Sequence, residues 1–243
     1  MTRIGTPAAA LLTLALLAAG CGGGSSSAKD TAPTKAQATA AATAINLTKA
    51  DVAADLEASD HDSSDDSSDK AVEKEVATCI GVDQKVLDDT NTISDEYSPD
   101  FAKGEPPSGY QINSDVKVVS SKDVAKKQLA VYQDSKTADC LSSAFDKEFK
   151  KTLGSEPGAT LGKVTIKKLD ADAAGTDGAF AFEVSLPISG GGLSLDVKAR
   201  IYGFLVKHTE VTLTTASFGT DIPDDVVKGA YSKLVERAKK SAV

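Results

Sequence analysis

The sequence predicts an α+β domain, with an antiparallel meander sheet and helices packed on one of its faces. Three consecutive runs in the last third of the chain alternate apolar and polar residues, as half-buried strands do. Stripes of apolar residues at helical spacing come before these runs, and one more follows them. Gly190-Gly191-Gly192 makes the first turn between the runs, and Lys207-His208-Thr209 makes the second.

The first residues have the features of an export signal. Arg3 precedes an apolar run over residues 8–17, about half of the ~20 residues that a membrane-spanning helix needs. The segment Leu17-Ala18-Ala19-Gly20-Cys21 resembles a bacterial lipobox, which implies cleavage before Cys21 and lipid on its thiol and new amino group. An ordinary signal peptide with a chance cysteine is the alternative. We therefore expect a lipoprotein signal peptide over 1–20, and a palmitate-bearing anchor at Cys21 on the extracytoplasmic face of the cell membrane.

Residues 21–44 are predicted to be a flexible tether. They are mostly Gly, Ser, Ala, Thr and Lys, and such a composition cannot bury enough apolar surface to offset the entropy of ordering. Apolar residues return at Ile45, so we place the folded domain at 45–243. Within it, Thr48 and Asp51 have the spacing of a capping box, which predicts a short helix.

The segment 59–68 is predicted to be a disordered acidic loop. It consists almost entirely of Asp and Ser, and the wider stretch 51–69 holds eight carboxylates without a basic residue. A calcium loop is the sharper alternative, because carboxylates suit that ion. The glycine and the closing glutamate of an EF-hand are absent, so we favour a solvated loop without a metal.

Helices and strands are then expected in order along the chain. The predicted helices cover 69–80, 120–132, 137–153 and 223–240, and their apolar residues recur at i, i+3, i+4 and i+7. The predicted strands cover 110–119, 163–169, 180–186, 193–202 and 211–215. Helices carrying Phe145 and Leu234 can cover the apolar face of the strands. The opposite face, with Lys198, Arg200 and Tyr202, is left for solvent or for partners.

Three cysteines are present, and lipidation would use Cys21. Cys79 and Cys140 remain as an even number in an exported domain, so a disulfide between them is the default expectation. A zinc site would need two further ligands, but neither His61 nor His208 lies at ligand spacing from a cysteine. Two free buried thiols are the remaining alternative.

No catalytic signature stands above background. Gly-x-Ser-x-Gly and His-Glu-x-x-His are absent, and the Gly190-Gly191-Gly192 run lies between two strands, unlike a phosphate-binding loop. Ser114 and Lys117 match Ser-x-x-Lys by chance, because the match falls on a predicted strand and Lys-Thr-Gly is missing. The net charge of −8 without basic clusters argues against nucleic acid. We expect no enzyme activity and no cofactor.

The order of segments between Glu96 and Lys240 resembles that of the PknH-like extracellular sensor domains of actinobacterial exported proteins. The segments that carry this resemblance are Cys79-Ile80-Gly81-Val82, Tyr97-Ser98-Pro99-Asp100-Phe101, Cys140-Leu141 and Asp221-Ile222-Pro223. The resemblance implies an antiparallel sheet with helices on one side, a groove for a ligand, disulfide stapling and no catalysis. The chain departs from the kinase-linked domains in having one cysteine pair where more are expected.

The sequence therefore predicts a lipid-anchored, extracytoplasmic ligand-binding or sensor-like lipoprotein, whose ligand is a small molecule or a lipid. An envelope lipid carrier, with apolar cargo between sheet and helices, is the first alternative. A hydrolase is the second, and a convergent Ser/His/Asp set in a pocket would favour it.

Replacing the lipobox cysteine tests the anchor. The variant Cys21→Ser should leave the membrane fraction or stay uncleaved, because serine offers no thiol for the lipid. Membrane fractionation and intact-mass measurement check this result. A variant that stays in the membrane fraction with the mass of the processed wild type would show that the anchor assignment is wrong.

Overall fold

A computed structural model describes residues 31–61, 66–105, 107–153, 159–190 and 193–243. Within these residues the chain forms five α-helices and a nine-stranded sheet, all of whose strand pairs are antiparallel. The α+β class and the antiparallel meander are therefore confirmed. The expected signal peptide and Cys21 lie outside the described residues. In the described ranges, no helix is long and apolar enough to cross a membrane.

Most elements agree with the expected ranges to within a few residues. The helices are α1 (Lys35–Ile45), α2 (Asp66–Ile80), α3 (Lys122–Gln133), α4 (Thr137–Leu153) and α5 (Asp224–Ser241). The strands are β1 (Glu57–Ser59), β2 (Thr92–Tyr97), β3 (Asp100–Glu105), β4 (Ser108–Val119), β5 (Ala159–Leu161), β6 (Thr165–Leu169), β7 (Gly178–Gly190), β8 (Leu193–Val206) and β9 (Thr209–Phe218).

The long strands form the middle of the sheet. The strand order is β1-β3-β4-β9-β8-β7-β5, and β2 and β6 extend the same sheet. On the outer edge of β4, β3 pairs with its first half and β2 with its second half. The outer edge of β7 is shared in the same way, because β6 pairs with its first half and β5 pairs with its last residues. The strands β7, β8, β9 and β4 therefore have hydrogen-bonded neighbours on both sides.

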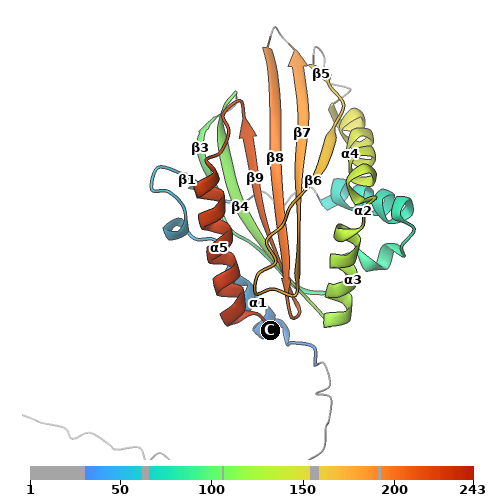
Figure 1. Cartoon of the computed structure of the whole chain (residues 1–243), viewed down its shortest axis with the longest axis vertical. Coiled ribbons are helices and arrows are strands. Elements are labelled where there is room, and N and C mark those ends of the chain that lie inside the picture. The colour runs from blue at the N-terminus through green and yellow to red at the C-terminus, as the bar shows by residue number, and fades with distance from the viewer. Residues whose placement is uncertain (1–30, 62–65, 106, 154–158, 191–192) are drawn as a thin grey trace, which may run out of the picture.

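The helices cover both faces of the sheet, which differs from the single covered face that we expected. In Figure 1, α5 lies on one side of the sheet and α2, α3 and α4 lie on the other. α1 and α5 pack against a core that includes Phe204 and Leu213. The other helices contact strand residues whose side chains point to the opposite face, such as Leu205 and Phe182. Successive side chains of a strand point to opposite faces, and apolar residues occupy both sets of positions.

The expected tether over 21–44 requires a correction, because α1 begins at Lys35. A capping box starts this helix: Thr34 N donates to Gln37 Oε1 at 2.9 Å, and Gln37 N donates to Thr34 Oγ1 at 3.3 Å. Alanine is the best helix former, and a stripe of small residues lets a helix approach a sheet closely. The stripe was not recognised in the sequence because it is mostly alanine. It packs against β2, β4 and α5. The buried residues of α1 are Ala38, Ala41, Ala42 and Ile45.

The expected disordered loop over 59–68 also requires a correction. Ser59 ends β1, which pairs with β3, and α2 already begins at Asp66. His61 Nδ1 lies 3.0 Å from Asp100 Oδ1, and the His61 ring stacks on Tyr97 at 4.6 Å between centroids. These partners lie far along the chain, so local composition does not reveal them. Residues 62–65 are outside the described ranges.

Cys79 on α2 and Cys140 on α4 form a disulfide, with their Cα atoms 5.7 Å apart. They are the pair that the cysteine count favoured. The two helices also pack through a small apolar cluster that includes Val76 and Ala144. The disulfide therefore joins the helix farthest from the sheet to one that contacts β6.

Removing the disulfide should lower stability strongly. The double variant Cys79→Ala/Cys140→Ala is expected to lose about 4 kcal/mol of unfolding free energy, because the bond spans 61 residues and restricts the unfolded chain. Urea denaturation of the variant and of the wild type, each with and without reductant, measures the loss. Equal midpoints for oxidised and reduced wild type would contradict this expectation.

Candidate functional site

A cleft between the sheet and helices α2, α3 and α4 contains an apolar cavity of about 250 Å³. One wall comes from strands β6, β7 and β8, and the other comes from the helices and the short turn after α2. A concave apolar space at the junction of sheet and helices is where small-molecule sites usually form. Its apolar lining residues are Val72, Val76, Leu87, Leu141, Phe145, Ile166, Phe180, Phe182, Val184 and Ile201, beside the ring of Tyr132.

A second, smaller cavity of about 70 Å³ adjoins the first, and its lining is a mixture of apolar, polar and ionisable side chains. The two cavities share the lining residues Tyr132, Phe180 and Thr212. We refer to the smaller cavity, with Asp115, Lys117 and Glu210 in its lining, as the polar end of the cleft. The cleft therefore has an apolar body and one end rich in ionisable groups.

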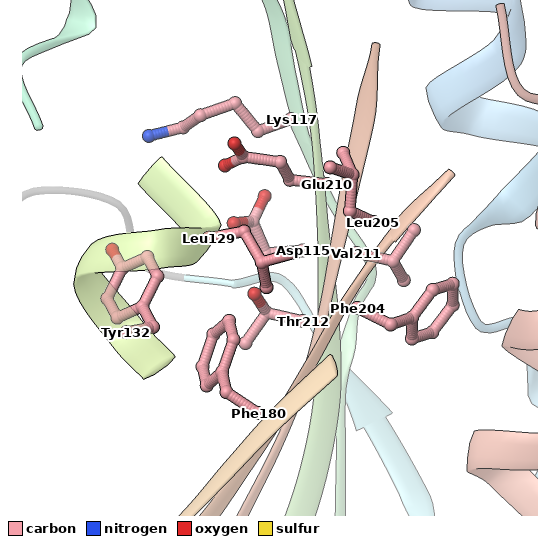
Figure 2. Close-up of a pocket in the computed structure, with 10 residues that line it drawn as sticks. All are labelled: Asp115, Lys117, Leu129, Tyr132, Phe180, Phe204, Leu205, Glu210, Val211 and Thr212. Atoms are coloured by element: carbon pink, nitrogen blue, oxygen red, sulfur yellow. The ribbon is translucent and has the colours of Figure 1, made fainter. Parts of the chain in front are cut away.

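Strand register brings the groups of the polar end together. Asp115 lies opposite Thr212 and Lys117 lies opposite Glu210 in the pairing of β4 with β9, and Asp95 lies opposite Lys117 in the pairing of β2 with β4. Figure 2 shows the side chains of Asp115, Lys117, Glu210 and Thr212 on the same side of the strands. Three carboxyl groups and one ammonium group thus share one face of the sheet, beneath α3.

Aromatic rings form the boundary between the apolar body and the polar end. Tyr132 of α3 stacks on Phe180 of β7, with 4.4 Å between ring centroids and 20° between their planes. The Phe180 ring occupies the space over Gly203 on β8, where a Cβ atom would lie 2.1 Å from Phe180 Cζ. A side chain at position 203 would therefore displace the ring, so this glycine fixes the position of Phe180 and its stack with Tyr132.

The carboxyl groups of the polar end have unmet hydrogen-bonding capacity. Asp95 Oδ1, Asp115 Oδ1 and Glu210 Oε1 are buried and have no hydrogen-bond partner. Lys117 Nζ lies 3.8 Å from Asp95 Oδ2. A buried polar atom without a partner costs free energy, which is why most such atoms in proteins are paired. These three oxygens are among seven buried side-chain atoms without a partner in the described part of the fold, and they lie close together.

Burial changes the acidity of these groups. Burial, with the nearby carboxyls of Asp95 and Glu210, holds the pKa of Asp115 well above its usual value of 3.8, although Lys117 acts in the opposite direction. Burial also raises the pKa of Glu210 from 4.5 to about 7, with a contribution from Asp95 and an opposing one from Lys117. Burial raises the pKa of Tyr132 to about 12, so its hydroxyl stays neutral. Glu210 is therefore largely protonated in mildly acidic solution.

The chance match of Ser114 and Lys117 to a catalytic pattern has no structural basis. The two residues lie three apart on β4 and so point to opposite faces. Ser114 Oγ donates to Asn46 Oδ1 at 2.7 Å and accepts from Leu47 N at 2.9 Å, so its role is to hold the segment after α1. Within the described ranges, no group of three or more His, Cys, Asp and Glu side chains could hold a metal ion.

A larger cavity of about 640 Å³ lies on the opposite face, beside α5. We expected Lys198, Arg200 and Tyr202 of this face to be open to solvent or to partners. Arg200 is instead half-buried, and it donates to Glu183 Oε2 at 3.1 Å and to Asp224 Oδ1 at 3.2 Å. Three of the charged groups around this cavity, those of Arg200, Glu183 and Asp224, are therefore paired with one another.

Comparison with known proteins adds a distant structural similarity. No known protein family matches the chain, and no curated protein matches it. The structure is similar to the crystal structure of the extracellular domain of PknH from Mycobacterium tuberculosis, with 11% sequence identity and a TM-score of 0.45. The similarity covers 87% of this chain and 99% of that domain. This is the family whose segment order the sequence resembles, and nothing about the site follows from so distant a relationship.

The sequence located part of the cleft. Phe145 was expected on a helix face that covers the sheet, and Phe180 on the apolar side of a strand, and both line the cleft. Leu234 and Val211 belong to the core on the other face of the sheet, although Val211 also borders the smaller cavity. The polar end was missed, because alternating polar residues on a strand were assigned to solvent. The available signal was the pair of opposite charges formed by Lys117 on β4 and Glu210 on β9. This signal can be recognised only when the pairing of the two strands is known.

The raised pKa of Glu210 predicts a pH-dependent effect on stability. A carboxyl whose pKa is higher in the folded state stabilises the fold below about pH 4.5, and this contribution is lost as the pH rises to about 7. Glu210→Gln should therefore raise the unfolding free energy at pH 8 by roughly 1–3 kcal/mol and have little effect near pH 4.5.

Urea denaturation from pH 4.5 to 8 measures this difference between variant and wild type. The exposed Glu57 serves as a control, and Glu57→Gln should change the unfolding free energy by less than about 0.5 kcal/mol. A Glu210→Gln variant that is less stable than wild type at pH 8 would show that Glu210 makes a favourable ionic contact instead.

Proposed function

We propose that this protein is an extracytoplasmic ligand-binding or sensor-like domain that takes a small, mainly apolar molecule into the cleft between the sheet and α2–α4. The observation that carries the proposal is the apolar cavity of about 250 Å³ with a few polar groups converging at one end. Apolar walls provide affinity and a few placed polar groups provide orientation, and this combination is typical of small-molecule sites.

Attachment to the membrane is part of the same proposal. The lipobox ending in Cys21 and the short apolar run before it support a lipid anchor on the extracytoplasmic face. The disulfide between Cys79 and Cys140 agrees with an oxidising compartment. A domain held at the membrane surface in this way would meet ligands or partners of the cell envelope.

A role in binding without turnover is supported by the chemistry of the cleft. Neither histidine is among the residues that line it: His61 contacts Asp100, and the buried His208 lies near Val119 O. The polar end offers carboxyl groups, a lysine and a tyrosine, but no serine or cysteine paired with a base. The cleft therefore lacks the usual parts of a nucleophilic hydrolase.

An envelope lipid carrier remains the second candidate, because the body of the cleft is apolar. Its volume of about 250 Å³ is below the range of about 300–1,000 Å³ that is usual for drug-sized ligands. A lipid with two acyl chains would therefore need the α2 and α4 layer to move away from the sheet. The disulfide keeps these two helices together, so they would have to move as one unit.

Filling the cavity tests the proposed function. Val184 is half-buried and lines the cavity, so Val184→Phe should occupy the ligand space and weaken binding of the apolar fluorescent probe N-phenyl-1-naphthylamine at least tenfold. Fluorescence titration of the purified soluble domain measures the dissociation constant. Thermal unfolding checks that the variant is folded.

The matched control is Val235→Phe, because Val235 is a half-buried valine that packs on the other face of the sheet. This change should leave probe binding within twofold of wild type. Binding that is absent in the wild type, or equally weak in both variants, would show that the cleft is not the ligand site.

A further inference from the structure

We infer that the polar end of the cleft binds a primary ammonium group, so that the ligand is an amphipathic amine with its apolar tail in the larger cavity. This inference rests on the proposed function of the cleft, because it names the class of ligand for that same site. It assigns a separate task to each cavity: the apolar body holds the tail, and Asp115 and Glu210 hold the head group.

Unmet hydrogen-bond acceptors are the first argument. Asp115 Oδ1 and Glu210 Oε1 are buried, have no partner and belong to residues that line the smaller cavity. Ionised carboxyl oxygens accept hydrogen bonds but cannot donate them. A ligand that satisfies both must bring N–H or O–H donors, and a primary ammonium group offers three N–H donors on a compact cation.

The balance of charge is the second argument. Several elements around the polar end contribute ionisable groups: Asp95 comes from β2, Asp115 and Lys117 from β4, Glu210 from β9, Tyr132 from α3 and Glu73 from α2. Among these groups, Lys117 supplies the positive charge, against the four carboxyl groups of Asp95, Asp115, Glu210 and Glu73, and its Nζ lies 3.8 Å from Asp95 Oδ2. A bound cation would let Asp115 and Glu210 ionise without leaving a buried negative charge uncompensated.

The aromatic boundary is the third argument. Tyr132 and Phe180 are stacked and line both cavities, so a ligand that spans the cleft must pass their rings. A cation beside an aromatic ring is attracted to it, most strongly where water is excluded. Beyond the rings the lining is apolar apart from Glu73 and Thr212, which suits a hydrocarbon tail. An anionic head group would instead face the carboxyl groups and would be repelled.

Proton release should accompany amine binding. Glu210 has a pKa of about 7, so below that pH it binds a proton that the ammonium group must displace. An alkylamine, like a lysine side chain, keeps its charge to about pH 10. The affinity for an amine should therefore increase from pH 5.5 to pH 8, whereas the affinity for an uncharged alcohol of equal chain length should change little.

Matched probes test the inference. Decylamine, decanol and decanoate are each used to displace N-phenyl-1-naphthylamine from the purified domain at pH 8. Decylamine should bind roughly tenfold or more tightly than decanol, and decanoate should bind most weakly. Decyltrimethylammonium should bind less tightly than decylamine, because its charge is the same but it has no N–H donor.

The double variant Asp115→Asn/Glu210→Gln is the second arm of the experiment. It should bind decanol and the fluorescent probe like wild type and lose the preference for decylamine and its increase with pH. If neither the probe nor decanol binds wild type, the proposed function is wrong. The amine inference is wrong if both bind wild type but decylamine binds no more tightly than decanol. It is also wrong if decylamine keeps its higher affinity in the double variant. In both cases the cleft remains a binding site. Displacement of decylamine by calcium at equal concentration would also overturn it.

Discussion

Coverage of the sheet on both faces is the constraint on which the rest of the structure depends. Along β4 and β9, one set of alternating residues, including Val116 and Leu213, packs beneath α1 and α5. The other set includes Asp115 and Glu210, which in a sheet with one wet face would be solvated. Helix α3 lies over that second face, so groups that alternation would place in water are enclosed. The polar end of the cleft is a direct consequence.

The cleft stays open because the helices above it are held at its margins. Ser142 Oγ of α4 donates to Val164 O at 2.7 Å next to β6, and Gln133 Nε2 of α3 donates to Ala179 O at 3.0 Å on β7. The disulfide and a separate apolar cluster fix α2 on α4 and not on the sheet. These supports surround the space over β7 and β8 without filling it, so the cavity follows from where the helices are attached.

The sequence predicted what depends on local periodicity and missed what depends on pairing across the sheet. The alternating runs of β7, β8 and β9 and the stripe of α5 have clear periods, and both the class and the meander followed from them. α1 was missed because its buried face is alanine, which a test for large apolar residues does not detect. Arg237 of α5 donates to Asn46 O at 2.7 Å and to Asp51 Oδ1 at 2.6 Å, partners that lie nearly two hundred positions away and that local periodicity does not reveal. The polar end was missed for the same reason, because only strand register brings Asp115 and Glu210 together.

Two kinds of buried carboxyl group in this molecule differ in how their oxygens are paired. Asp51, beneath α5, has a side chain that is only 3% exposed, and both of its oxygens are paired: Oδ2 accepts from Thr48 and Oδ1 from Arg237. Burial acts to raise its pKa, yet these hydrogen bonds hold it below the usual value, so the ionised form is stable where it lies. Asp115 and Glu210 have the opposite balance, with burial dominant and one oxygen of each unpaired. A ligand that binds only the folded state and supplies the missing donors stabilises the fold in proportion to its affinity. The hydrogen-bond donors that Asp115 Oδ1 and Glu210 Oε1 lack are therefore the donors that the proposed ammonium group would supply.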